Sequence, residues 1–292
     1  MKQFKALHEL DLCVEKGEIF GFVGPNGAGK TTTIKILAGL HDASSGRATI
    51  FSEPVSTPKA NAHIGFLPER PYFYVHLTPR ELLHFYGQLY EIPKRERENR
   101  IEELLTRTDM LDFIDVPMKS FSKGMLQRVG LCQTLLHKPA LLILDEPMSG
   151  LDPLGRAMVR DIILEENQRG CTVFFSSHVL SDVEKICDRV AIVIKGTLRS
   201  IDTVENLVTS SGHVEFVVSA QNIPSEWTAT KMSSGVFRFC VDTSIRESRI
   251  DELRSMDAQI LEIRPVHSSL EDILVEEIKK EKILPDSMGV WT

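Results

Sequence analysis

The sequence predicts an α/β fold: a core with a mostly parallel sheet, a helical insertion within that core, and a small α+β domain after it. Short apolar stretches alternate with helical ones over residues 18–194, which is typical of a parallel sheet covered by helices on both faces. Between residues 78 and 137 the apolar residues recur at helical spacing only. A glycine-rich loop at residues 24–31 joins the first buried strand to a helix.

The first part of the core is predicted to contain several strands and one helix. Apolar stretches bounded by Gly, Pro or Ser indicate the strands, which we place at residues 4–13, 18–23, 47–51 and 63–67. The helix begins after the glycine-rich loop and ends near Gly39, because glycine favours the left-handed conformation that closes a helix.

The helical insertion is predicted at about residues 72–138. Its first helix begins at Thr78, where a proline and then Glu81 follow, the pattern of a capping box with proline at the first helical position. A charged amphipathic helix is expected at residues 94–107 and a third helix at residues 122–136.

The core then resumes as alternating strands and helices. Strands are predicted at residues 140–144, 172–177 and 189–194, with helices at residues 153–168 and 179–187.

A Thr-Ser-Ser-Gly stretch at residues 209–212 predicts a domain boundary. We therefore expect a core domain at residues 1–208 and a small accessory domain at residues 212–292. The accessory domain is predicted to contain three strands and two helices, at residues 213–219, 236–242, 249–256, 259–265 and 268–280.

Composition limits the class of protein. The chain has 292 residues, a net charge of −7 and five scattered cysteines without a C-x-x-C pair, so neither a zinc site nor a disulfide framework is indicated and a reducing compartment is expected. No apolar stretch approaches the length of a membrane helix, and the N-terminus lacks the apolar region of a signal peptide. We expect a cytoplasmic protein without a strong general attraction to nucleic acid.

Residues 24–31, GPNGAGKT, match the phosphate-binding pattern G-x-x-x-x-G-K-[ST] at every fixed position. The glycines allow several backbone N–H groups to point at one anion, and the following helix adds the positive end of its dipole. Lys30 is expected to reach the β- and γ-phosphates, and Thr31 to bind Mg²⁺ through its hydroxyl. The core is therefore predicted to be that of a P-loop NTPase. The residues predicted to bind the nucleotide are Gly24, Pro25, Asn26, Gly27, Ala28, Gly29, Lys30, Thr31 and Thr32.

Acidic residues follow the buried strand at residues 140–144, at the sheet edge where α/β proteins place ligand groups. Asp145 is predicted to hold Mg²⁺, and Glu146 to accept the proton of the water that attacks the γ-phosphate. His178 ends the next core strand and is predicted to hydrogen-bond the γ-phosphate. The alternatives are a solvated strand end and an ordinary surface or core histidine.

Two further positions carry weaker signals. Glu69 follows the strand at residues 63–67, where it is able to face the metal; a surface carboxylate is the alternative. Ser122 and Gly124 begin a helix whose hydroxyl and free N–H groups form an anion site. A plain helix cap is the alternative there.

In this order, the motifs resemble the ATP-binding subunits of ABC transporters. The segments that carry the resemblance lie within residues 4–205 and are GPNGAGKTT, FLPE, FSKGMLQR, LLILDEP, SGLD and SSH. FSKGM stands where that family usually has the signature LSGGQ, so Lys123 and Met125 depart from the usual glycine and glutamine. Glu69 stands where the family usually has a metal-contacting glutamine. FLPE, FSKGM and the C-terminal domain look like the branch that pairs with separate, export-type membrane proteins.

The resemblance implies ATP and Mg²⁺ as cofactors, and ATP hydrolysis coupled to transport. It also implies a head-to-tail dimer, either a homodimer or a heterodimer, with ATP between the phosphate loop of one subunit and Ser122 and Gly124 of the other. Asp152 would lie at that dimer interface. A separate transmembrane permease would hold the subunit at the inner face of the cell membrane.

The family's adenine-stacking aromatic residue precedes the first Ala-Leu pair, here Ala6-Leu7, and so falls at about Met1. The sequence is therefore expected to begin after that residue, with Phe4 as the available substitute.

Other functional classes fit the residues less well. A soluble ABC ATPase acting in DNA repair or translation is the main alternative, but the repair type has a very long coiled-coil insertion and the translation type has two ATPase cassettes. A module that binds ATP without hydrolysing it would not need Glu146 and His178. A GTPase would need an N-K-x-D motif, which the sequence lacks.

Overall fold

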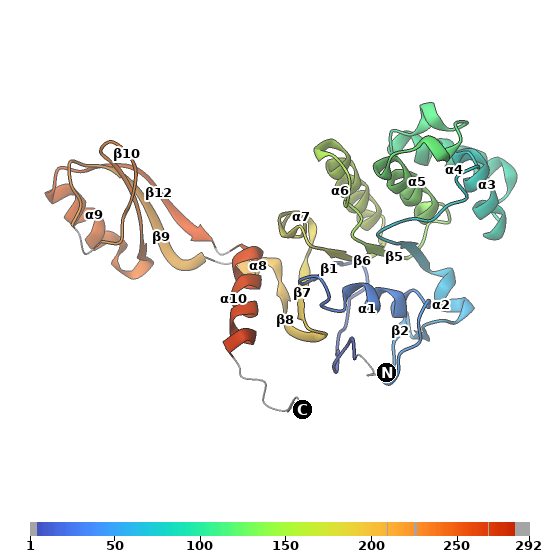
Figure 1. Cartoon of the computed structure of the whole chain (residues 1–292), viewed down its shortest axis with the longest axis horizontal. Helices are drawn as coiled ribbons and strands as arrows, with labels where there is room; N and C mark the ends of the chain where they lie inside the picture. Colours follow the sequence, from blue (N-terminus) through green and yellow to red (C-terminus); the bar gives the residue numbers. More distant parts are fainter. Residues whose placement is uncertain (1–4, 209, 225–226, 268, 284–292) are drawn as a thin grey trace, which may run out of the picture. The chain divides into compact units, whose positions relative to one another are not determined.

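The computed structural model describes residues 5–208, 210–224, 227–267 and 269–283 (Figure 1). The chain divides into two compact units, Met1–Val204 and Glu205–Thr292. The division falls at the start of a short helix, α8 (Val204–Val208), a few residues before the boundary expected from the sequence.

The first unit is built on a six-stranded sheet with the order β4-β5-β6-β1-β7-β8. Neighbouring strands are parallel from β4 to β7, and only β8 is antiparallel to its neighbour, which confirms the predicted mostly parallel sheet. The strands are β1 (Ile19–Val23), β4 (Ile64–Leu67), β5 (Leu141–Asp145), β6 (Thr172–Ser177), β7 (Arg189–Ile194) and β8 (Thr197–Thr203).

Helices cover both faces of this sheet, with α1 on one face and α6 and α7 on the other (Figure 1). Every residue of β1, β5 and β6 is buried, as expected for strands covered twice. In the core, the rings of Phe20 and Phe174 stack with centroids 5.8 Å apart. The other elements of this part are α1 (Lys30–Leu37), β2 (Thr49–Ile50), β3 (Glu53–Pro54), α2 (Pro58–Ala62), α6 (Pro153–Gln168) and α7 (Leu180–Ile186).

The helical insertion lies between β4 and β5 (Figure 1). The predicted capping box at its start is confirmed, because the Glu81 N–H donates to Thr78 Oγ1 over 3.2 Å and the Thr78 N–H donates to Glu81 Oε2 over 2.9 Å. The insertion contains α3 (Pro79–Leu89), α4 (Lys94–Arg107), η1 (Leu111–Phe113), η2 (Met118–Ser120) and α5 (Lys123–Leu135).

The second unit has a four-stranded antiparallel sheet with the order β10-β11-β9-β12. Its core contains Phe216 and Phe239 from the sheet, whose rings stack 5.5 Å apart, and Leu253 from α9. The elements are β9 (Ser210–Ser219), β10 (Thr230–Ser233), β11 (Val236–Asp242), η3 (Thr243–Ile245), α9 (Arg246–Ser255), β12 (Gln259–His267) and α10 (Leu270–Ile283).

One predicted strand is wrong. Residues 5–15 form no strand, although Leu10 and Leu12 do pack against the core. The edge of the sheet beside β7 is taken by β8, which the sequence did not predict. Over its described residues, the N-terminal segment makes one backbone hydrogen bond to the turn between β7 and β8, from the His8 N–H to the Gly196 carbonyl over 2.7 Å. A single bond does not make a ladder.

Among the described residues, no helix combines the length and apolarity that crossing a membrane requires.

Candidate ATP-hydrolysing site

The phosphate loop follows β1 and has a backbone path that only glycine tolerates at several positions. A Cβ at Gly24 would lie 2.1 Å from the Val193 carbonyl oxygen. Gly27 and Gly29 have φ angles of +79° and +99°, in the left-handed region. Gly29 is also the N-cap of α1 and offers no side-chain acceptor, so the N–H groups of the first helical turn are left for an anionic ligand.

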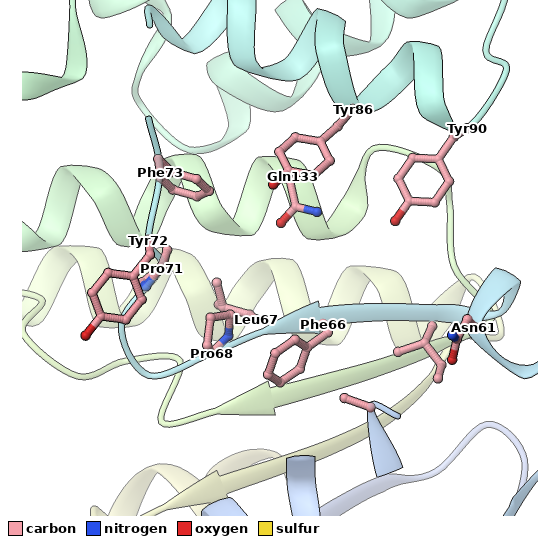
Figure 2. A pocket seen from close by; sticks show the side chains of 12 residues that line it. Asn61, Phe66, Leu67, Pro68, Pro71, Tyr72, Phe73, Tyr86, Tyr90 and Gln133 are labelled. Carbon is pink, nitrogen blue, oxygen red and sulfur yellow. The ribbon is translucent and has the colours of Figure 1, made fainter. Parts of the chain in front are cut away.

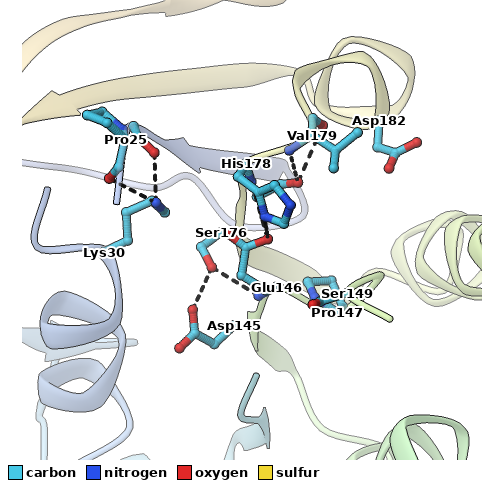
Figure 3. Close-up of polar contacts among 12 residues, drawn as sticks. Pro25, Lys30, Asp145, Glu146, Pro147, Ser149, Ser176, His178, Val179 and Asp182 are labelled. Carbon is cyan, nitrogen blue, oxygen red and sulfur yellow. Dashed lines mark hydrogen bonds and ion pairs between the residues drawn. The ribbon is translucent and has the colours of Figure 1, made fainter. Parts of the chain in front are cut away.

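Lys30 is the first residue of α1, and its side chain reaches back to the start of the loop. Its ammonium group donates to the Gly24 carbonyl over 2.7 Å and to the Pro25 carbonyl over 3.3 Å (Figure 3). Burial lowers the pKa of Lys30, and the negative charges of Glu146, Asp145 and Glu69 partly offset this effect. The three carboxylates predicted to act in the site are therefore close enough to influence one ammonium group.

Asp145 is the last residue of β5 and is only 3% exposed. The Ser176 hydroxyl on the neighbouring strand β6 donates to Asp145 Oδ1 over 2.7 Å and accepts from the Glu146 N–H over 3.0 Å (Figure 3). One buried hydroxyl thus orients both acidic residues. The sequence alone does not reveal this role of Ser176, because the role depends on the parallel register that places Ser176 opposite Asp145.

Glu146 and His178 form a hydrogen-bonded pair. Glu146 Oε2 lies 2.6 Å from His178 Nδ1 and accepts the His178 N–H over 3.2 Å (Figure 3). Glu146 has a φ angle of +52°, uncommon for a residue with a side chain and found where local function constrains the backbone. The Glu146 side chain is 12% exposed and the His178 side chain 56% exposed, so the pair is open to a ligand from the histidine side.

The residues predicted to hold Mg²⁺ fit that ion in chemical type. Thr31, Glu69 and Asp145 offer hydroxyl and carboxylate oxygens, which are the ligands Mg²⁺ prefers. Glu69 is half-buried and follows β4; because β4 and β5 are parallel, with Leu67 opposite Leu144, Glu69 and Asp145 come to the same edge of the sheet.

A second group of predicted site residues lies at the start of α5 and α6. Ser122 caps α5 by accepting from the Met125 N–H over 3.2 Å, and Asp152 caps α6 by accepting from the Gly155 N–H over 3.0 Å. A Cβ at Gly124 would lie 3.4 Å from the Gly150 carbonyl oxygen, so the two helix starts adjoin through the segment between Glu146 and Asp152.

The remaining predicted residues lie where the sequence placed them along the chain: Pro25, Asn26 and Ala28 in the loop and Thr32 in the first turn of α1. Met1 and Phe4, the positions considered for the adenine-stacking aromatic, lie outside the described residues.

Comparisons with known proteins agree with these features. The family model for ABC transporters matches residues 7–149. An ABC transporter ATP-binding protein of Synechocystis sp. is 38% identical over 97% of this chain and 81% of its own length. The bacitracin transport ATP-binding protein of Bacillus licheniformis is 40% identical over 75% of this chain and 72% of its own length.

Solved structures lead to the same family. The structure of an ATP-binding subunit of an ABC transporter superposes with a TM-score of 0.65 at 30% identity, covering 69% of this chain and 85% of that one. The chain therefore belongs to the ATP-hydrolysing, ATP-binding subunits of ABC transporters.

Proposed function

We propose that this chain is the motor subunit of an ABC exporter, and that Glu146 is its general base. The observation that carries the proposal is the hydrogen-bonded pair of Glu146 and His178 at the carboxyl edge of the sheet. The negative charge of Glu146 also acts on the ammonium group of Lys30 in the phosphate loop. These groups supply what ATP hydrolysis needs: a cation and N–H groups for the phosphates, and a carboxylate to accept a proton.

The reaction assigns one task to each residue. The loop N–H groups and Lys30 hold the β- and γ-phosphates. The water oxygen bonds to the γ-phosphorus as the bond to the bridging β–γ oxygen breaks, and Glu146 takes the water proton. His178 orients the Glu146 carboxylate through its backbone N–H and its ring. Thr31, Asp145 and Glu69 would hold Mg²⁺, which supplies charge neutralisation for the β- and γ-phosphates.

A second copy or a related subunit completes the site. Subunits of this family dimerise and pair with membrane permeases. Ser122 is exposed at the start of α5, where the hydroxyl and the helix N-terminus suit an anion. We assign Ser122 and Gly124 to the γ-phosphate held by the opposite subunit, and Asp152 to the interface beside it.

The permease contact belongs to the helical insertion. A groove of about 280 Å³ lies beside the end of β4 and includes residues of α3 and α5. Five aromatic rings line it, those of Phe66, Tyr72, Phe73, Tyr86 and Tyr90 (Figure 2). Such a groove suits a short amphipathic segment of the permease. Relatives named for bacitracin transport and for linearmycin resistance support export as the direction of transport.

The test is to purify the chain with the membrane protein encoded beside it and to measure ATP hydrolysis in lipid. Glu146→Gln should lower turnover by about 10²-fold or more, because the amide cannot accept the proton, while ATP binding is retained and a dimer accumulates. Glu102→Gln, at an exposed position in α4, is the matched control. Turnover of Glu146→Gln within a few-fold of the parent would show that Glu146 is not the base.

Ser122→Arg tests the shared site. The arginine side chain should fill the space for the opposite subunit's γ-phosphate, so hydrolysis is lost while nucleotide binding to the monomer, followed with a fluorescent ATP analogue, is unchanged. Normal hydrolysis by Ser122→Arg would exclude a site formed between two subunits.

A further inference from the structure

Lys123 replaces the glycine usual at the third signature position, and its side chain contacts residues of the segment after Glu146. Its ammonium group donates to Ser149 Oγ over 3.1 Å. Its aliphatic stem lies over Gly150, where a Cβ would come within 2.8 Å of Lys123 Cδ. Gly150 has a φ angle of +77°, a conformation that favours glycine at residue 150.

Three more residues of α5 contact the segment of residues 147–152, which begins directly after Glu146. Gly124 packs against the Gly150 carbonyl and Leu151. The buried Gln127 Nε2 donates to the Pro147 carbonyl over 3.3 Å. Arg128 lies 3.8 Å from Asp152 Oδ1.

The start of α5 therefore touches both ends and the middle of the segment of residues 147–152. The Lys123–Ser149 bond is the contact that a glycine at residue 123 would lack.

We propose that Lys123 is a positioning residue that couples the ATP held at Ser122 to the catalytic carboxylate of its own chain. The inference rests on the proposed function, in which Ser122 and Gly124 meet the ATP of the opposite subunit. When that ATP engages the start of α5, the tether from Lys123 to Ser149 transmits the displacement of the helix to the segment of residues 147–152. Glu146 directly precedes this segment, so a displacement of the segment would shift the Glu146 backbone, whose N–H donates to Ser176, and with it the carboxylate that the His178 N–H and ring contact.

Positioning and direct phosphate binding by Lys123 would have different effects on kcat and on dimerisation. A lysine that bound the opposite phosphate directly would contribute to ATP-driven dimerisation. A lysine that acts through Ser149 instead lowers kcat when it is removed, and leaves both dimerisation and the KM for ATP unchanged.

The decisive experiment is a double-mutant cycle in the complex with the permease. Lys123→Met keeps an apolar stem over Gly150 and removes the ammonium group; Ser149→Ala removes the acceptor. Each should lower kcat roughly 3- to 10-fold, the range for one ordinary hydrogen bond, because the Lys123–Ser149 bond is exposed to solvent. The double variant should be no slower than the worse single variant, because both changes remove one interaction. Lys123→Arg should restore most of the rate.

Lys119→Met, at an exposed lysine of η2, is the matched control and should leave the rate unchanged. Dimerisation is measured in the Glu146→Gln background by light scattering with ATP. If the double variant lowers kcat by the product of the two single effects, or if Lys123→Met has the kcat of the parent, the coupling role of the Lys123–Ser149 bond is refuted. Loss of dimerisation in Lys123→Met would assign the lysine to phosphate binding and also refute the coupling role.

Failure of the proposed function has a different signature. In that case the parent complex shows no hydrolysis, or Ser122→Arg has no effect. If the parent complex hydrolyses ATP and loses this activity in Ser122→Arg, but Lys123→Met has the kcat of the parent, only the coupling role of Lys123 is refuted.

Discussion

Ser176→Ala is the change that most directly tests how the acidic end of β5 is built. The hydroxyl is fully buried and makes two bonds, a charge-assisted one to Asp145 Oδ1 at 2.7 Å and one from the Glu146 N–H at 3.0 Å. Removing the hydroxyl leaves Asp145 Oδ1 and the Glu146 N–H without this hydrogen-bond partner.

The magnitude follows from the two bonds. A hydrogen bond to a charged group contributes about 1.5–3 kcal/mol and a neutral one about 1 kcal/mol, so Ser176→Ala should lower the free energy of unfolding of the first unit by about 2–4 kcal/mol. For a domain of this size that corresponds to a fall in Tm of roughly 4–16 °C. Turnover should fall about tenfold because the Glu146 backbone loses its anchor, and the KM for ATP should change less.

A control exists at the other end of the same strand. Thr172 is also buried, and its hydroxyl accepts one bond, from the Gly17 N–H over 2.9 Å. Thr172→Val should cost about 1 kcal/mol and should leave kcat unchanged. Thermal unfolding and ATP turnover of both variants decide the matter. If Ser176→Ala were no less stable than Thr172→Val and as active as the parent, the anchoring role of Ser176 would be refuted.

Two further predictions concern the phosphate loop and the thiols. Gly24→Ala should weaken ATP binding at least tenfold, because its Cβ would lie 2.1 Å from the Val193 carbonyl oxygen. Gly17→Ala, with φ +84° and nothing within 4 Å, should lower the free energy of unfolding by only about 1–2 kcal/mol. If the close approach at Gly24 were unimportant, isothermal titration with ATP and thermal unfolding would show equal effects for the two variants. Mass spectrometry after iodoacetamide treatment at pH 8 should find two thiols modified quickly and three only after unfolding, since burial raises the pKa of the three buried thiols, to about 12 in two of them, and three or more fast thiols would contradict this. The fast thiols are Cys13 and Cys240, and the slow ones are Cys132, Cys171 and Cys187.

Local rules predicted the elements whose signals are local. The helix of residues 94–107 has the same bounds in the structure as in the prediction, with Ile101, Leu104 and Leu105 buried along one face. The capping box of Thr78 and Glu81 likewise depends on residues three positions apart. Short-range patterns of this kind contain all the information that the element needs.

Elements that depend on a distant partner were missed. The strand β8 contains Arg199 and Asp202 and lacks a buried face in the sequence pattern; it forms because β7 presents an open edge. Because β8 occupies this edge, residues 5–13 cannot pair with β7 and form no strand. Strand choice at a sheet edge is a competition between segments, and neither segment alone reveals the outcome.

The candidate site divides in the same way. The identities of Lys30, Asp145 and Glu146 follow from motif and strand position, because glycine loops and strand ends place ligands by local geometry. The structure adds what orients them: Ser176 through the register of β5 and β6, and His178 through its bond to Glu146. The sequence pattern predicts which groups take part in hydrolysis, and the pairing of distant strands determines how those groups are oriented.

The chain order of the site also bears on why hydrolysis should need a partner subunit. Glu146 and Asp152 are six positions apart, and the segment between them is held by α5, whose start carries Ser122. The residue proposed as the general base is thus followed directly by a segment that contacts the helix start assigned to the other subunit's ATP. Within one subunit, a link between Glu146 and the start of α5 would not connect Glu146 to that subunit's own ATP, because its phosphate loop lies elsewhere, after β1. In a dimer the same continuity lets binding at one site bear on the geometry of the other, which is the kind of reciprocal coupling that a motor with two ATP sites requires.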